Sequence, residues 1–339
     1  PPHPDPLMKI LVTGSTGFLG SAIARELLSD GRDVRLLVRK GADTRNIDDL
    51  DVEVALGDLR DPSSLKSALT GCSVLYHAAA YYSLWDRDQR LIYDINVAGT
   101  RNILQAAREC GLDRIVYTST VGCIGLNPDG APADETTPFD PATLSNDYKR
   151  SKYQAEQVAL EFAESGLPVV IVNPSTPVGP RDIKPTPTGK IVLDFLNRNM
   201  PAYLDTGLNL IDVADCARGH LLAEEKGTPG ERYILGNRNM SLFEILLTLE
   251  NITGLKAPRI KIPYWTALAA GWVCETLSNR VTGRPPAIPL AGVRMAKYFM
   301  YFDSSKAVRE LGLPQNPVET ALKQAVDWFQ NHNCTRAKN

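Results

Sequence analysis

The sequence contains no pair of cysteines at metal-binding or redox spacing. Its six cysteines lie at wide, irregular intervals, and none of its four histidines accompanies a cysteine pair. Zinc sites and disulfide frameworks both depend on such regular spacing. We therefore expect no metal site, no disulfide bonds, and free thiols in a protein of the reducing cytoplasm.

An excess of charge of one sign is also missing. Lys and Arg number 37 and Asp and Glu number 39, so the formal net charge is −2. Nucleic-acid binding normally needs a strongly basic face, and this class of partner is not expected. A near-neutral total still permits a small basic group that holds one phosphate.

Long apolar runs are scarce as well. The best candidate, residues 262–277, is interrupted by Pro263, Gly271 and Glu275 and falls short of the roughly 20 residues that cross a bilayer. It is predicted to be a core or surface helix, and contact with a membrane surface stays open for it. Residues 1–7 lack the pattern of a signal peptide, and we expect a disordered extension or an expression remnant there.

The chain does contain an alternation of apolar strands and amphipathic helices. Strands are predicted at 9–13, 34–38, 52–56, 73–77, 114–118 and 168–172. Helices are predicted at 18–29, 62–69, 88–110 and 147–164. Such an alternation gives a parallel sheet with helices on both faces, so the predicted fold class is α/β, a Rossmann-type doubly wound sheet.

The clearest motif is Thr13-Gly-Ser-Thr-Gly-Phe-Leu-Gly20, between the first strand and the first helix. Its glycines allow a tight turn, a close approach of the backbone to a pyrophosphate, and close packing of helix on strand. The flanking strand and helix are the context expected of a dinucleotide site. The expected cofactor contacts in this loop are Gly14, Ser15, Thr16, Gly17, Phe18 and Leu19.

The end of the second strand distinguishes the two nicotinamide dinucleotides. NAD sites tend to carry a carboxylate there for the ribose 2′-hydroxyl, and none stands between Val34 and Ala42. Arg39 and Lys40 stand there instead, with Arg45 nearby. A guanidinium can bind a 2′-phosphate bidentately, so NADP(H) is the preferred cofactor, while NAD(H) stays open.

Three further strand ends supply candidate contacts. Asp58 follows the third strand and could accept from the adenine amino group. Small side chains at Ala78, Ala79 and Ala80 leave room for a cofactor across the fourth strand. The fifth strand ends in Thr118-Ser-Thr120, where a hydroxyl could polarise a substrate carbonyl or simply cap the strand.

Tyr148 and Lys152 stand four residues apart on the predicted helix 147–164. This spacing puts the phenol and the ammonium on one helical face. A nearby positive charge favours the phenolate, so we expect Lys152 to lower the pKa of Tyr148. Tyr148 would then serve as an acid or base near neutral pH.

Taken in order, these motifs resemble the extended branch of the short-chain dehydrogenase/reductase superfamily, over nearly the whole chain from Met8. The resemblance implies that Tyr148 transfers the proton and that Lys152 holds the nicotinamide ribose. Thr120, where the family usually has serine, would orient the substrate, and Ser119 is a second candidate. Further cofactor contacts implied by the resemblance are Leu59, Asn96, Thr118, Pro174, Ser175 and Thr176.

The chain is expected to divide into two domains. Residues 8–180, with a strand and helix near 208–235 that return to the sheet, would form the NADP-binding domain. Residues 181–207 and 236–331 would form a smaller, mainly helical substrate domain. Its helices are predicted at 241–253, 264–278, 303–311 and 317–329.

Two enzymatic hypotheses stand beside each other. The run from Asn173 to Pro180 resembles dihydroflavonol 4-reductases and 3β-hydroxysteroid dehydrogenases, which favours NADPH-dependent reduction of a ketone or aldehyde on a mid-sized, partly apolar substrate. Residues 169–189 resemble proteins named hopanoid-associated sugar epimerases, which keeps a nucleotide-sugar epimerase or dehydratase open.

Each hypothesis points to different supporting residues. In a reductase, Tyr81, Tyr82 and Trp85 could stack on a substrate ring, or simply pack. In an epimerase, Arg181 and Lys184 could hold a diphosphate. A dinucleotide-sensing or scaffold role is the non-enzymatic alternative. A homodimer through the helices 88–110 and 147–164 also stays open.

Overall fold

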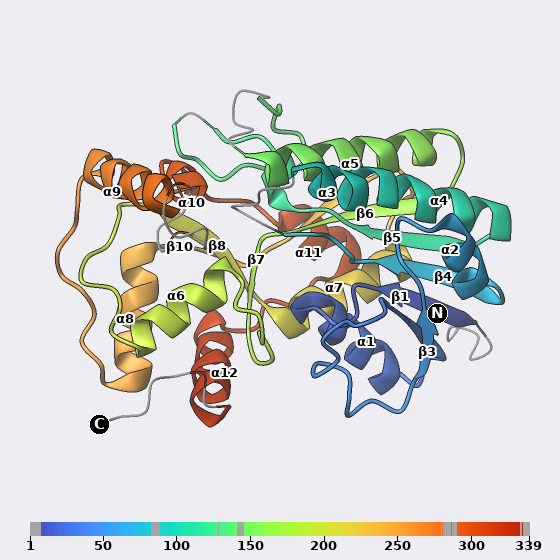
Figure 1. The fold of residues 1–339 in the computed structure, drawn as a ribbon, viewed down its shortest axis with the longest axis horizontal. Helices are drawn as coiled ribbons and strands as arrows, with labels where there is room; N and C mark the ends of the chain where they lie inside the picture. Colours follow the sequence, from blue (N-terminus) through green and yellow to red (C-terminus); the bar gives the residue numbers. More distant parts are fainter. Residues whose placement is uncertain are drawn as a thin grey trace.

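The computed structural model describes residues 8–82, 89–127, 129–140, 146–278, 280, 286, 290–332 and 334. Across these residues, a seven-stranded parallel sheet runs in the order β3-β2-β1-β4-β5-β6-β9 (Figure 1). Its strands are β1 (Lys9–Thr13), β2 (Val34–Val38), β3 (Glu53–Leu56), β4 (Cys72–His77), β5 (Arg114–Thr118), β6 (Val169–Pro174) and β9 (Arg232–Leu235). The predicted doubly wound sheet is confirmed.

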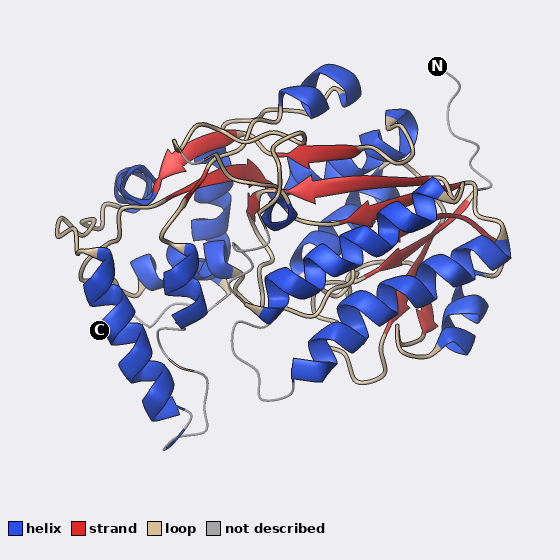
Figure 2. Cartoon of the chain, turned by 90° about the horizontal axis from the view of Figure 1, so that it is seen from above, coloured by secondary structure: helices blue, strands red, loops and turns tan. Residues whose placement is uncertain are grey.

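Helices cover both faces of this sheet, as Figure 2 shows. On one face lie α1 (Phe18–Ser29), α7 (Val213–Lys226) and α11 (Ser305–Leu311). On the other lie α2 (Pro62–Leu69), α4 (Gly99–Cys110) and α5 (Asp147–Glu164). Because the central strands are buried on both sides, they are nearly continuous apolar runs in the sequence.

The helix predicted at 88–110 contains a wider turn. Its described part consists of α3 (Gln89–Tyr93), a π-helical turn (Asp94–Ala98) and α4. Such single π turns are rare inside helices and gather at functional sites. This turn carries Asn96, one of the predicted contacts.

The strand predicted near residue 208 does not return to the central sheet. Instead, β8 (Gly207–Asp212) pairs with β7 (Thr176–Val178), β10 (Arg238–Ser241) and β11 (Phe299–Met300) in a second, four-stranded sheet of the described chain. The strand that does return is β9, which lies parallel to β6. Its four residues are too short a run to stand out in the sequence, and β8 is mostly buried, as a strand of the central sheet would also be expected to be. The helix α7 packs on the central sheet as predicted.

The smaller part of the structure has its own apolar core. It lies between β8 and the helices α6 (Pro187–Leu196), α8 (Leu242–Thr253) and α12 (Val318–Asn331). α9 (Tyr264–Leu277) and α10 (Leu290–Met295) pack on each other beside it (Figure 1). No helix of the described residues is long and apolar enough to cross a membrane. The predicted domain boundaries remain a prediction, and residues 1–7 lie outside the described ranges.

Candidate functional site

Most of the predicted site residues gather at the carboxyl edge of the central sheet. The glycine-rich loop follows β1, Arg39 follows β2, Asp58 and Leu59 follow β3, Ala78–Ala80 follow β4, Thr118 ends β5, and Pro174–Thr176 follow or end β6. The strand order turns between β1 and β4. Ligands of open α/β sheets bind outside such a turning point.

The turn after β1 requires glycine at two positions for different reasons. Gly14 has a φ of +72°, and a Cβ there would lie 2.7 Å from the backbone carbon of Ala78. A Cβ on Gly20 would lie 2.2 Å from the carbonyl oxygen of Gly14. The loop is therefore pressed against the end of β4 on one side and against α1 on the other.

The loop leaves polar groups available at the start of α1. Gly17, the N-cap of this twelve-residue helix, has no side chain to bind the first backbone N–H groups. The buried Ser15 Oγ has no hydrogen-bond partner among the described residues. An uncapped helix N-terminus and an unpartnered hydroxyl fit the pyrophosphate of a dinucleotide, because both can donate to phosphate oxygens. Within the same loop, Thr16 accepts from Asn46 through its carbonyl oxygen, at 3.1 Å.

The basic residues after β2 differ in what they bind. Arg45 forms a bidentate pair with Asp43, with N···O distances of 2.9 and 2.7 Å. Arg39 and Lys40 are exposed and form no salt bridge within the described chain. Arg39 is thus available to a 2′-phosphate, whereas Arg45 is neutralised by its neighbour.

Asp58 and Leu59, the two predicted cofactor contacts after β3, both interact with other residues of the protein. Asp58 binds Arg60 through both carboxylate oxygens, and the Arg60 guanidinium, with a weaker contribution from Arg39, holds the pKa of Asp58 at about 2, below its usual range. Leu59 is buried in the core, and its carbonyl oxygen accepts from Asn102 at 2.9 Å. The predicted adenine contact of Asp58 stays a prediction.

A buried network that the sequence did not reveal joins β1 to β4. Thr13 Oγ1 lies 2.8 Å from His77 Nδ1, and His77 Nε2 lies 3.2 Å from Thr100 Oγ1. The N–H of Ala79 donates to Thr13 Oγ1 at 3.2 Å. Burial lowers the pKa of His77 to about 3, so the ring is neutral at pH 7. The network fixes the strand ends under the glycine-rich loop.

Tyr148 lies in the first turn of α5, next to a second tyrosine. The rings of Tyr148 and Tyr82 meet edge-on, with centroids 4.6 Å apart. Burial, followed by the nearby Tyr82, raises the pKa of Tyr148. The expected lowering of this pKa by Lys152 is therefore not seen, because desolvation of the phenol dominates. Trp85, the third predicted aromatic, lies outside the described residues.

Lys152 lies one turn further along α5 and is almost fully buried. Its Nζ donates to the carbonyl oxygen of Thr118 at 2.9 Å and reaches the hydroxyl of Tyr117 at 3.4 Å. Burial lowers the pKa of Lys152. The ammonium is thus held at the carboxyl end of β5.

The hydroxyls after β5 have separate partners. Thr118 Oγ1 lies 3.1 Å from His220 Nε2, and His220 Nδ1 lies 2.7 Å from the carbonyl oxygen of Cys216. Thr120 Oγ1 accepts from the N–H of Gly122 at 3.1 Å, at the start of a 3-10 turn (Val121–Cys123). Thr118 is therefore used inside the fold, whereas the partly exposed Thr120 still has its own O–H to donate.

Asn96 uses its amide to hold another loop. Its Oδ1 accepts from the N–H of Tyr81 at 2.7 Å, and its Nδ2 donates to the Tyr81 carbonyl oxygen at 3.0 Å and to Ser151 Oγ at 2.9 Å. The amide therefore joins the loop after β4 to the catalytic-candidate helix α5. Its predicted contact with a cofactor stays a prediction.

Glu156 is a second buried group that the sequence analysis did not single out, and it is linked to Thr120 through Asn173. Glu156 is one turn beyond Lys152 on α5 and fully buried, and burial raises its pKa. Asn173 Nδ2 donates to Glu156 Oε2 at 2.7 Å and to the carbonyl oxygen of Thr120 at 3.0 Å. Arg232 of β9 lies 3.4 Å from Glu156 Oε1. A charged residue four positions after Lys152, on the same helical face, was the available signal.

The segment after β6 leaves one polar group free. Ser175, between Pro174 and Thr176, has a buried Oγ with no partner in the described part of the structure. This hydroxyl and that of Ser15 are two unpartnered groups at predicted cofactor positions. Together with the glycine turn, they make the residues present compatible with a nicotinamide dinucleotide.

The residues predicted to hold a diphosphate are not brought together. Arg181 Nη2 binds Asp49 Oδ2 at 2.8 Å, and Asp49 also binds Arg25 at 2.5 Å. Lys184 is exposed. Arg181 therefore anchors its loop to the segment before β3, which weakens the support for a diphosphate clamp.

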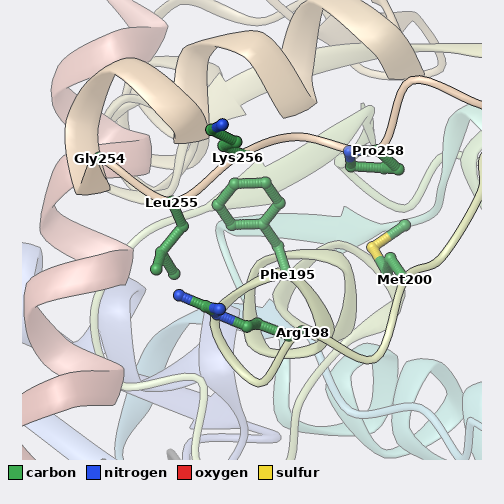
Figure 3. Close-up of a pocket in the computed structure, with 7 residues that line it drawn as sticks. All are labelled: Phe195, Arg198, Met200, Gly254, Leu255, Lys256 and Pro258. Atoms are coloured by element: carbon green, nitrogen blue, oxygen red, sulfur yellow. The ribbon is translucent and has the colours of Figure 1, made fainter.

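A hollow of about 390 Å³ lies elsewhere, between the ends of α6 and α8 (Figure 3). It is lined by Phe195, Arg198, Met200, Gly254, Leu255, Lys256 and Pro258. Two helix C-termini face this region, and their partial negative charge balances the two basic side chains. It contains none of the predicted site residues. No group of three or more potential metal ligands occurs in the described ranges.

Comparison with known proteins gives consistent matches. The profile of the NAD-dependent epimerase/dehydratase family matches residues 10–236. The chain is 51% identical to a Synechocystis protein named "Putative dihydroflavonol 4-reductase", over 96% of each chain. It is 39% identical to "Sterol demethylase protein B" of Methylococcus capsulatus, over 95% of this chain and 98% of that one. The crystal structure of gox2253 superposes with a TM-score of 0.86 at 46% identity, over 97% of this chain and 100% of the other.

Proposed function

Since the chain belongs to the NAD-dependent epimerase/dehydratase family of extended short-chain dehydrogenases/reductases, we propose that it is an NADPH-dependent reductase of a ketone or aldehyde. Its homologues are NAD(P)-dependent reductases, epimerases and dehydratases, so it is an oxidoreductase of that cofactor class. The proposed substrate is mid-sized and partly apolar.

Reduction is supported most directly by the placement of Tyr148 and Lys152 one turn apart on α5, with the Lys152 ammonium held at the end of β5. Burial raises the pKa of this phenol, so the group carries its proton at neutral pH. Reduction of a carbonyl needs a proton donor at the oxygen, whereas oxidation of a hydroxyl needs a base there. The phenol, protonated as an ordinary tyrosine is at neutral pH, can act as the donor that reduction needs.

The nicotinamide dinucleotide supplies the hydride when bound. Ser15, the N-terminus of α1 and Ser175 would hold it. The O–H of Thr120 would donate to the substrate carbonyl and stabilise the charge that develops on its oxygen. Tyr148 would give its proton to that oxygen, and the Lys152 ammonium would stabilise the phenolate left behind.

The preference for NADPH rests on Arg39. Among the basic residues predicted after β2, it is exposed and without a salt bridge in the described chain, close enough to Asp58 to lower its pKa. A guanidinium in this place offers two parallel N–H donors to a phosphate.

The apolar character of the proposed substrate rests on Tyr82 and on two relatives. Tyr82 presents its ring edge-on to Tyr148, where a substrate ring could also pack. The names of the Synechocystis and Methylococcus relatives refer to a dihydroflavonol and a sterol, both of which are polycyclic. We also propose cytoplasmic residence, and a homodimer through α4 and α5.

An epimerase or dehydratase of a nucleotide sugar is the second candidate, favoured by the family profile. An epimerase that returns the hydride to its substrate retains its cofactor, whereas a reductase exchanges it. Purified protein that carries stoichiometric dinucleotide after gel filtration would favour the epimerase. Protein that is free of dinucleotide, and that binds added NADPH reversibly, would favour the reductase.

The proposal is tested by Tyr148→Phe on a panel of cyclic ketones and aldehydes, followed by the loss of NADPH absorbance. We expect the rate to fall by about 100-fold or more with NADPH binding unchanged, because the phenol acts only in proton transfer. Tyr153→Phe is the matched control on the same helix, since its ring stacks on Phe139 at 4.4 Å. Full turnover by Tyr148→Phe would contradict the mechanism.

A further inference from the structure

Helix α9 has its large apolar side chains on the outside. Ala267, Gly271 and Ser278 are the residues of this segment that are buried. Trp265 is 70% exposed, Trp272 62%, Val273 47% and Leu277 53%. At about 3.6 residues per turn, these four large residues lie on the face opposite the small ones.

The inner face of α9 packs on α10 through its small residues. A Cβ on Gly271 would lie 3.4 Å from Leu290 Cδ1 and 3.4 Å from Val293 Cγ2. Leu290 and Val293 of α10 therefore lie against the inner face, and the large side chains of α9 lie on the outer one. Four large apolar side chains on one helix face exceed the scattered singles that a monomer normally exposes.

The charges around this face have one predominant sign. Among the described residues from 264 to 300, the basic side chains are Arg280, Arg294 and Lys297, and all are exposed. The acidic one, Glu275, accepts from the N–H of Leu290 at 3.1 Å and so is used inside the α9–α10 pair. The whole chain has a formal net charge of −2, so this region is basic against the average of the molecule.

The face lies close to the candidate catalytic helix. Asn146, the N-cap of α5, donates to Met295 Sδ of α10 at 3.6 Å. Tyr148 follows two residues later. In Figure 1, α9 and α10 lie together at the edge of the molecule near the beginning of α5.

We propose that the outer face of α9, with Arg294 of α10 and Lys297 just after it, docks on the surface of an anionic lipid bilayer. Tryptophan is favoured at the level of the lipid headgroups, and an amphipathic helix flanked by Arg and Lys lies in that plane. Basic residues near an anionic bilayer each add about 1 kcal/mol of attraction. The docked face would also deliver an apolar substrate towards Tyr148, and this second statement rests on the proposed function. The docking itself does not depend on the proposed function.

A second copy of the chain fits this face less well. A two-fold contact through this face would leave Arg294 and Lys297 of both copies without acidic partners from the described part of this region. A lipid surface supplies the missing negative charge along the whole face. Lipid is therefore the occupant that both the aromatic and the charged residues favour.

The test is flotation of the full chain with vesicles of phosphatidylcholine, with and without phosphatidylglycerol. We expect binding to the phosphatidylglycerol vesicles, weakened by high salt, and a loss of at least about tenfold in the double variant Trp265→Ser/Trp272→Ser. Arg294→Gln/Lys297→Gln should remove the preference for phosphatidylglycerol. Val308→Ser, an exposed apolar position on α11, is the matched control and should bind as the wild type does.

A second measurement does not depend on the folding of a variant. Tryptophan fluorescence of the wild type should be quenched by vesicles of brominated lipid. Absence of both flotation and quenching would overturn the proposal, as would equal binding by the double tryptophan variant. A dimer in solution that the tryptophan substitutions dissociate, without vesicle binding, would also overturn it and assign the face to a second copy. Neither measurement uses turnover, so a failed reductase assay leaves the docking result separate.

Discussion

The Lys152 ammonium donates to the carbonyl oxygen of Thr118 at 2.9 Å and so ties the middle of α5 to the end of β5. Both groups are buried, which makes this a bond between a charge and a backbone acceptor away from water. It places the ammonium at the carboxyl edge of the central sheet. The candidate acid Tyr148 is therefore presented by a helix that its own sheet holds in place.

The first prediction concerns this bond. Lys152→Met should lower the free energy of unfolding by about 1–3 kcal/mol, because the Thr118 carbonyl loses its donor in a buried place. Activity should fall by about 100-fold or more if the ammonium also stabilises the phenolate. Lys149→Met is the control, since Lys149 is buried on the same helix without this bond. Urea unfolding and turnover, measured on both variants, check the prediction; equal effects of the two substitutions would contradict it.

The second prediction concerns cofactor choice. Arg39→Asp should weaken NADPH binding by about 30-fold, which corresponds to the loss of about 2 kcal/mol from a charge-assisted pair. NADH binding should change little, because it has no 2′-phosphate. Arg45→Gln should leave both affinities near the wild type, since Arg45 already binds Asp43. Fluorescence titration measures the NADPH and NADH affinities of both variants. An unchanged NADPH affinity in Arg39→Asp would refute the role of Arg39 in binding the 2′-phosphate.

The third prediction separates two requirements for glycine. Gly14 and Gly31 both have positive φ, at +72° and +71°, but a Cβ meets backbone atoms only at Gly14. Gly31→Ala should lower the free energy of unfolding by about 1 kcal/mol, because alanine disfavours the left-handed conformation. Gly14→Ala should cost at least about 2 kcal/mol more and reduce dinucleotide binding, because the loop must move away from β4. Urea unfolding of both variants is the measurement, and equal costs would show that the close approach to Ala78 does not matter.

The fourth prediction concerns pH. Burial lowers the pKa of His77 to about 3 and that of His220 to about 4, below the usual value of about 6.5. Between these values the unfolded chain binds more protons, so stability should fall as the pH drops below about 6.5, by up to about 1.4 kcal/mol per pH unit for each ring.

A variant isolates this contribution from other groups. Asp182, whose pKa burial raises to about 6, acts in the opposite direction and makes the total slope smaller. His220→Gln should therefore be compared with the wild type, and its unfolding free energy should depend less steeply on pH between about 6.5 and about 4. Parallel pH profiles of the two proteins would contradict the buried, neutral state of His220.

The sequence predicted the bounds of the helices and strands better than it predicted which strands pair with one another. The bounds of α1, α2, α5, β1, β2 and β5 agree with the predicted ranges, because apolar periodicity and helix ends are local signals. The second sheet was missed because β9 has only four residues, and because the apolar pattern of the buried β8 does not show which strands it pairs with. The lowered pKa expected for Tyr148 was wrong, because desolvation of the phenol dominates and burial is set by the tertiary structure.

The sequence alone therefore determined the doubly wound fold, the glycine-rich turn and the order of the motifs along the sheet edge. The tertiary structure decided what each polar group is free to do. Arg181 is bound by Asp49, 132 residues away, and Asn173 joins Glu156 to Thr120. It also decided that α9 carries its tryptophans outward, because α10 packs against the face of the helix that carries Ala267 and Gly271. Periodicity is set by neighbours along the chain, whereas hydrogen-bond partners and exposed faces are set by neighbours in space.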